Sequence, residues 1–174
     1  TDPCKSRAAE QPAALLFLAL RFAKTGGHMT QKIDWPGPGS NQIPFGVYTD
    51  PSLHQLELQR FFYEKHWCYV GLEAEIPRVG DFKRTVVGER SVIMTRHTDG
   101  EIHVFENICA HRGMRFCRDR HGNTKEFVCP YHQWSYSLKG ELQGVPFRRG
   151  VRQGNKVNGG MPSDFDPKQH SLNA

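Results

Sequence analysis

Two short boxes that mix cysteine with histidine constrain this sequence most. Cys109 and His111 are separated by one residue, Cys129 and His132 by two, and 17 residues lie between the boxes. Each box offers one thiol and one imidazole, and each follows a run that reads as the end of a strand. We therefore predict two loops at the tips of neighbouring hairpins, which bring the four side chains to one metal centre.

Two kinds of metal centre accept this set of side chains. One is a [2Fe–2S] cluster in which two histidines replace two cysteines on one iron. Cys109 and Cys129 would then hold the inner iron, and His111 and His132 the outer one. Because imidazole is neutral and thiolate is anionic, the outer iron takes an electron more readily and faces solvent and partners.

The second kind is a tetrahedral zinc site, which also accepts two cysteines and two histidines. Common zinc modules pair cysteine with cysteine and histidine with histidine along the chain. The mixed boxes of this sequence therefore favour the iron–sulfur cluster. A third alternative is a binding module in which the cluster has only a structural role.

The remaining pattern predicts a mainly β fold with an N-terminal helical arm. Apolar and polar residues alternate over 82–87, 91–97 and 101–106, and Asp99-Gly100 is typical of a two-residue hairpin turn between the last two strands. Shorter strands are expected at 126–128, 134–138 and 141–142. Short strands with glycine turns are typical of a small antiparallel sandwich or barrel. Asp50-Pro51-Ser52 begins a predicted helix over 52–66.

Changes in composition predict four segments in the 174 residues. Residues 1–28 are expected to be a non-native or upstream extension, because the character of the sequence changes at Met29. An extended arm rich in proline and glycine and an amphipathic helix occupy 29–66. The cluster domain is expected over 67–150, and a polar, glycine-rich linker over 151–174.

Charge and hydropathy exclude several classes of partner. The formal charge is +5, and the arginines gather in two groups that we interpret as a solvated basic face. These charges do not alternate with stacking aromatics, so we expect no nucleic-acid partner. We expect no membrane partner either, because no apolar run approaches the roughly 20 residues that cross a bilayer. The odd, scattered set of five cysteines argues against a disulfide framework and favours a cytoplasmic location.

Other potential ligands receive simpler interpretations. Cys68 and Cys117 are expected to be buried free thiols. Four histidines outside the boxes are expected at the surface or in the core: His66, His97, His103 and His121. Near the C-terminus, Asp164, Asp166 and His170 offer only one histidine, whereas a non-haem iron centre needs two with one carboxylate. We interpret 164–170 as part of the linker.

The boxes Cys-Ala-His-Arg-Gly and Cys-Pro-Tyr-His resemble the Rieske motif in the large (α) subunit of aromatic ring-hydroxylating oxygenases. The similarity extends from about Trp35 to Leu172 and includes three further stretches: 67–71, 77–82 and 144–147. Within the family the chain looks most like salicylate hydroxylases and anthranilate dioxygenases. Gln133 is one reason, because many other members have glycine after the second histidine.

The resemblance implies the cofactor and the partners. It implies one Rieske cluster, an electron donor that is a reductase or ferredoxin, and an oligomer with other large and perhaps small subunits. The family's mononuclear iron motif lies downstream of this domain and has no counterpart here, so we expect an N-terminal part of a large subunit, without catalytic residues. Respiratory Rieske proteins carry a disulfide where this chain has Met114 and Tyr131, so the oxygenase type is implied. Tyr131 and Trp134 are expected to limit the access of water.

Overall fold

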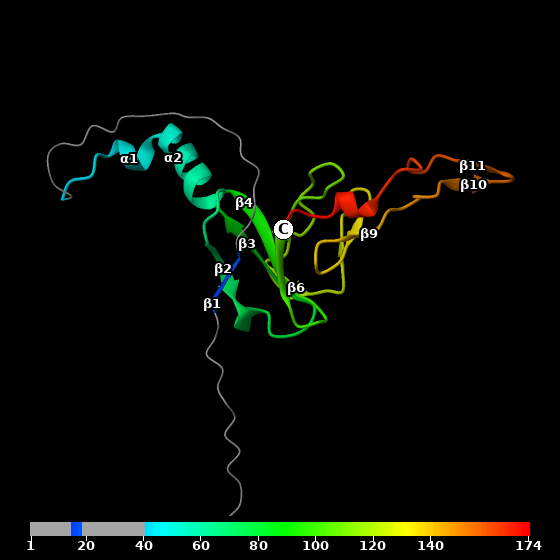
Figure 1. Cartoon of the computed structure of the whole chain (residues 1–174), viewed down its shortest axis with the longest axis horizontal. Helices are drawn as coiled ribbons and strands as arrows, with labels where there is room; N and C mark the ends of the chain where they lie inside the picture. The colour runs from blue at the N-terminus through cyan, green and yellow to red at the C-terminus, as the bar shows by residue number, and fades with distance from the viewer. Residues whose placement is uncertain (1–14, 19–40) are drawn as a thin grey trace, which may run out of the picture.

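The computed structural model describes residues 15–18 and 41–174. As predicted, its fold is mainly antiparallel β with a short helix near the N-terminal side (Figure 1). The strands form a four-stranded sheet in the order β5-β4-β3-β6, a three-stranded sheet in the order β7-β8-β9, and two separate pairs, β1-β2 and β10-β11. The strand bounds are β1 (Leu15–Leu18), β2 (Cys68–Leu72), β3 (Asp81–Val87), β4 (Arg90–Arg96), β5 (Ile102–Glu106), β6 (His121–Asn123), β7 (Phe127–Val128), β8 (Ser135–Tyr136), β9 (Leu142–Gly144), β10 (Val151–Gln153) and β11 (Lys156–Asn158).

The predicted helix is present but shorter than expected. The Asp50 carboxylate accepts a hydrogen bond from the Ser52 N–H at 2.7 Å, and Pro51 occupies the first helical position, where its missing N–H costs nothing. After α2 the chain widens into a π-helical turn that ends at Phe62, four residues before the predicted end. The helical segments are α1 (Gly46–Thr49), α2 (Pro51–Glu57), η1 (Leu58–Phe62), η2 (Glu73–Glu75) and η3 (Pro167–His170).

Strand β4 lies in the middle of the fold, and five consecutive residues of it, 91–95, are buried. Ile93 packs into the core cluster that also contains Phe105 and the two box cysteines. Val92 and Met94 point to the other face and pack in a second cluster with β2 and β3. Both faces of the four-stranded sheet are therefore covered, and the first cluster connects the sheet directly to the predicted metal loops.

The turn between β4 and β5 has three residues instead of the predicted two. His97 N–H donates to the Glu101 carbonyl at 2.9 Å, which leaves Thr98, Asp99 and Gly100 in the turn. Gly100 adopts a φ of 87°, a left-handed conformation that glycine takes without steric cost. The hairpin itself is where the Asp-Gly pair predicts it.

The C-terminal segment first leaves the domain and then returns to it. Strands β10 and β11 form an exposed hairpin that projects from the rest of the molecule (Figure 1). The chain then comes back, and Phe165 and Leu172 pack against the first core cluster. Leu172 N–H donates to Gly140 O at 2.8 Å, and Glu106 N–H donates to Asn173 O at 2.8 Å. The linker prediction for 151–174 describes composition and does not anticipate this packing.

Most of the proposed extension, 1–28, and the first part of the expected arm, 29–40, lie outside the described residues. Within the extension, β1 pairs with β2 in antiparallel register, with Leu15 opposite Leu72. The assignment of 1–28 to a non-native extension stays a prediction. No helix in the described part of the chain has the length and apolar character to span a membrane.

Candidate metal centre

The fold brings the four predicted ligands together from two loops. The loop of Cys129 and His132 connects β7 to β8, at the tip of a hairpin as predicted. The loop of Cys109 and His111 lies in a long connection from β5 to β6 and not in a hairpin. The prediction was wrong on this point because β6 pairs with β3, on the opposite edge of the sheet from β5.

The two loops share one backbone geometry. Cys109 N–H donates to Met114 O and Gly113 N–H donates to Cys109 O, at 2.8 and 2.9 Å. In the other loop the equivalent bonds join Cys129 to Trp134 and Gln133 to Cys129, both at 2.9 Å. Each loop therefore closes between its cysteine and the fifth residue after it, so that each histidine lies inside a hydrogen-bonded turn.

The fourth residue after each cysteine has a left-handed backbone. Gly113 has a φ of 69° and Gln133 a φ of 56°. A side chain makes this conformation costly, because its Cβ crowds the backbone. Gln133 thus occupies a position at which the turn favours glycine.

The two cysteines form the buried side of the site. Their exposed fractions are 3% for Cys109 and 2% for Cys129. Burial raises the pKa of the Cys129 thiol, and the neighbouring Cys109 adds to this, whereas backbone hydrogen bonds from Tyr131 and His132 act in the opposite direction. These backbone donors favour a thiolate, which is the form that binds a metal.

Tyr136 joins the two halves of the site, although no motif in the sequence singles it out. This tyrosine belongs to β8 and is fully buried. Its hydroxyl oxygen accepts the Ala110 N–H at 3.1 Å and lies 3.2 Å from Cys109 Sγ. Burial, followed by the bond to Cys109, raises the pKa of Tyr136. The hydroxyl is therefore neutral and can donate to the sulfur.

Asn107 closes the base of the first loop and was also missed. It is 1% exposed. Its side chain donates to Cys117 O at 2.7 Å and accepts from Cys117 N–H at 2.9 Å, so the two ends of the loop are tied by a reciprocal pair of bonds. Because the two partners are ten positions apart, no short sequence motif predicts this pair. A polar residue at the end of an apolar strand is the one sequence feature that points to Asn107.

The two predicted histidine ligands face each other and are framed by aromatic rings. The ring centroids of His111 and His132 are 4.6 Å apart. Trp134 is buried and stacks on His111 at 4.7 Å with an interplanar angle of 8°. Tyr131, which is 58% exposed, lies 3.9 Å from His132 by ring centroids. Trp134 thus shields one imidazole from water, and Tyr131 covers the other only in part.

The C-terminal segment supports Trp134 from behind. Phe165 and His170 stack on each other at 4.8 Å, and both rings meet the Trp134 indole edge to face. Because residues 164–170 were interpreted as linker, these contacts were not anticipated. They show that His170 contributes to aromatic packing beside the site.

The donor set fits the cluster that the sequence predicts. The sulfurs of the two box cysteines are buried, and the two box imidazoles face each other from turns with the same hydrogen bonds. Burial lowers the pKa of His111, and His132 and Arg112 add to the effect, so the His111 ring is neutral and can bind a metal. A [2Fe–2S] cluster with mixed ligation needs two cysteines and two histidines, which this set provides.

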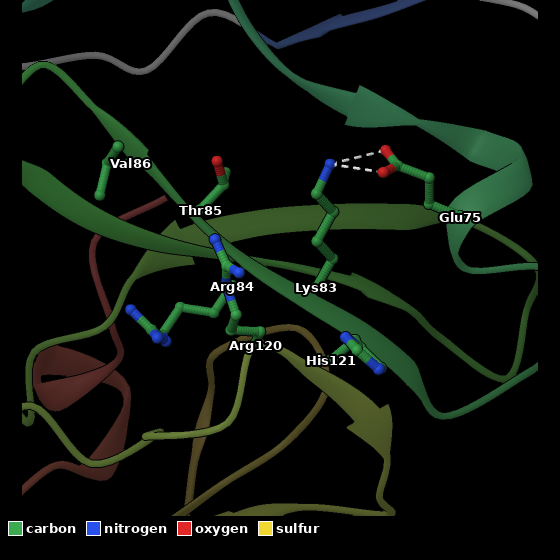
Figure 2. A pocket seen from close by; sticks show the side chains of 7 residues that line it. All are labelled: Glu75, Lys83, Arg84, Thr85, Val86, Arg120 and His121. Carbon is green, nitrogen blue, oxygen red and sulfur yellow. Dashed lines mark hydrogen bonds and ion pairs between the residues drawn. The ribbon is translucent and has the colours of Figure 1, made fainter.

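The remaining predicted residues lie elsewhere. Cys68 and Cys117 are free thiols, but both are only half-buried, so their predicted burial was wrong. A hollow on the face of β3 and β6 has Lys83, Arg84 and Arg120 in its lining and contains none of the four box residues (Figure 2). Figure 2 shows the Lys83 ammonium directed at the Glu75 carboxylate, with which it pairs at 2.7 Å. His121 is one of the residues that line this hollow (Figure 2).

Comparison with known proteins agrees with the site. The family model described as "Rieske [2Fe-2S] domain" matches residues 66–155, which include both boxes. The chain belongs to this family, and its cofactor is a Rieske [2Fe–2S] cluster. Its relatives within the family are the large subunits of oxygenases, which confirms the resemblance to the ring-hydroxylating type.

Two curated relatives show this similarity. The chain is 70% identical over 138 residues to "Salicylate 5-hydroxylase, large oxygenase component" of Ralstonia sp., which covers 79% of this chain and 33% of the relative. It is 45% identical over 163 residues to "Anthranilate 1,2-dioxygenase large subunit" of Burkholderia cepacia, covering 94% and 36%. The chain therefore spans about a third of the length of these relatives.

Solved structures share the fold. A naphthalene 1,2-dioxygenase from Rhodococcus sp. bound to indole is 36% identical, with a TM-score of 0.61 over 76% of this chain and 28% of the other. A second naphthalene 1,2-dioxygenase with indole in its active site is 33% identical, with a TM-score of 0.64 over 72% and 26%. The fold thus matches the same class of oxygenase.

Proposed function

We propose that this chain is the electron-transfer part of an aromatic ring-hydroxylating oxygenase large subunit, with a hydroxy- or aminobenzoate as the substrate of the whole protein. The observation that carries the proposal is the pair of matched loops that hold two buried cysteines behind two facing histidines. The similarity to a salicylate hydroxylase and an anthranilate dioxygenase supports the substrate class.

The four box residues are the proposed ligands. Cys109 and Cys129 hold the inner iron, and His111 and His132 the outer one. When bound, the cluster supplies a one-electron redox couple. The protein contributes the buried cysteines, the two imidazoles and the hydrogen-bonded turns that keep them at fixed positions.

The surrounding residues control access to this centre. Trp134 stacks on His111 and excludes water from that ring, and Tyr136 ties the first loop to β8. The histidine side, next to the exposed Tyr131, is where a redox partner can approach. Because short distances favour electron transfer, we infer that both donor and acceptor meet the protein at this side.

The partners follow from the family. The chain receives electrons from a reductase or ferredoxin and serves a mononuclear iron, bound in another part of the large subunit, where O₂ is activated. We infer that the full-length protein assembles with other large subunits, and perhaps with small ones. The segment assignments 29–66 and 67–150 remain part of this proposal, with the second as the cluster domain.

Metal analysis and spectroscopy test the proposal. Iron and acid-labile sulfide should each approach about two per chain, and the reduced protein should give a Rieske-type EPR signal. His111→Cys should alter or abolish that signal, because an all-thiolate cluster is more negative and harder to reduce. The matched control is His121→Cys, which places a thiol in the exposed strand β6 and should leave the signal unchanged.

Two results would contradict the proposal. A colourless protein with one zinc per chain would assign the boxes to a zinc site. A His111→Cys protein with the wild-type signal would remove His111 from the ligand set.

A further inference from the structure

A second group of potential metal ligands lies at the tip of the β4–β5 hairpin. It consists of His97, Asp99 and His103, and none of them belongs to the boxes. Each can offer one ligand atom, and the three atoms all lie within 4.8 Å of one another. We propose that these residues form a second metal site, which takes one divalent transition-metal ion of the zinc type.

The hairpin fixes the three residues on one side. His103 is paired opposite Thr95, and His97 follows Thr95 by two positions, so both imidazoles belong to the same face of the sheet. Their ring centroids are 5.8 Å apart. The left-handed Gly100 folds the turn back, and Asp99 Oδ2 comes to 3.0 Å from His97 Nδ1.

The donor chemistry selects the ion. Two imidazoles and one carboxylate suit zinc and neighbouring first-row ions, whereas calcium and magnesium prefer oxygen ligands alone. Ligand bonds of about 2.0–2.1 Å place adjacent ligand atoms at about 3 Å, close to the observed spacing of His97 and Asp99. The His103 ring must come closer to this pair for all three ligand atoms to bind one ion.

His103 also carries an independent indication of a ligand. Its Nε2 atom is buried and has no hydrogen-bond partner within the described residues. Buried polar atoms in native proteins are almost always paired, so an unpaired one calls for an explanation. A bound cation would give the His103 ring the partner that the protein does not supply.

Lys139 competes for this site. Its ammonium group lies 2.7 Å from Asp99 Oδ2, the oxygen that also meets His97. A metal ion must displace this lysine from the carboxylate. Replacing Lys139 frees a lone pair of Asp99 Oδ2 and removes a positive charge from the site. Lys139→Met should therefore bind the metal more tightly than the wild type.

The experiment uses the cluster-loaded protein, so that the boxes are already filled. Titration with Zn²⁺ by calorimetry, with iron and zinc measured after dialysis, should give one zinc per two irons and no loss of iron. Co²⁺ should bind at the same stoichiometry and develop visible absorption bands. His103→Gln should weaken zinc binding by about tenfold or more. The matched control, His121→Gln, should bind zinc as the wild type does.

His103→Gln could weaken zinc binding simply by damaging the fold. Lys139→Met separates the two cases, because damage to the fold cannot tighten binding. The inference is overturned if the loaded protein binds no stoichiometric zinc, if iron falls as zinc rises, or if neither His103→Gln nor Lys139→Met changes the affinity. None of these results bears on the iron–sulfur assignment, which rests on iron, sulfide and EPR.

Discussion

At the scale of single residues, the two metal loops place different residues at one strained backbone position. Gly113 and Gln133 both have a left-handed backbone and make the same hydrogen bond to the cysteine four residues before. Glycine adopts this conformation freely, and glutamine does so at a cost. The second loop therefore stores strain that the first does not.

Relieving this strain should stabilise the protein. We expect Gln133→Gly to raise the free energy of unfolding by about 1 kcal/mol, measured by urea denaturation of the cluster-loaded protein. Gln143→Gly is the matched control. Gln143 lies in strand β9, where glycine lowers stability by about 0.5–1 kcal/mol. If Gln133→Gly also lowers stability, the glutamine side chain makes contacts that outweigh the strain.

Tyr136 is the second residue whose replacement has a defined outcome. Tyr136→Phe removes the acceptor of the Ala110 N–H and a donor to the Cys109 sulfur. We expect a loss of about 1–3 kcal/mol in stability, because the partly buried Ala110 N–H loses its acceptor and the buried Cys109 sulfur loses its partner. The reduction potential should become more negative, because hydrogen bonds to sulfur favour the reduced cluster. Voltammetry checks the potential, and Tyr48→Phe, at an exposed position, should change neither quantity.

At the scale of elements, the strands that alternate are those that the sequence predicts well. Strands β3, β4 and β5 lie within one residue of their predicted ends, because each places apolar side chains in the core clusters. Strand β6 has no such signal, since its three residues are all exposed where they pair with β3. The four ligand candidates were predictable from their spacing. Asn107 and Tyr136 were not, because their partners are ten or more positions away.

Asp81 links elements at the start of β3. Its carboxylate accepts the Asn123 side-chain N–H at 2.8 Å and the Arg78 N–H at 2.9 Å. The bond from Asn123, followed by that from Arg78, lowers the pKa of Asp81. A lowered pKa in the folded state means that the contribution to stability is complete above the unfolded pKa and is lost as pH falls through the folded pKa.

The free energy of unfolding of the wild type should therefore drop between about pH 5 and pH 3 by more than that of Asp81→Asn. Urea denaturation at both pH values measures the difference. Asp164→Asn, in the exposed C-terminal segment, is the control and should keep the wild-type pH dependence. Parallel curves for Asp81→Asn and the wild type would show that Asp81 plays no part in acid sensitivity.

At the scale of the whole molecule, the last residues complete the core that surrounds the metal loops. Leu172 is buried in the same cluster as Cys109, Cys129 and Trp134, although it lies about 40 positions after the second box. Phe165 packs against Trp134 from the same segment. The composition of 151–174 suggested a linker, because the few apolar residues in this polar stretch give no periodic signal.

Leu172→Ala should lower the free energy of unfolding by about 3 kcal/mol, through lost burial and the cavity that remains. Val157→Ala, in the exposed β10–β11 hairpin, should change it by less than about 0.5 kcal/mol. Urea denaturation of both variants with the cluster bound measures the contrast. Equal effects would show that the C-terminal segment detaches without consequence for the domain.

The bond from Glu106 N–H to Asn173 O joins the C-terminal segment to strand β5. Strand β5 is an edge of the four-stranded sheet, and an edge offers unpaired backbone groups to any other strand that comes near. The returning chain occupies part of this edge and keeps it from foreign strands. The residues that complete the core thus also protect the sheet edge against aggregation. Until these residues have been synthesised, the edge of a nascent chain can pair with strands of other chains.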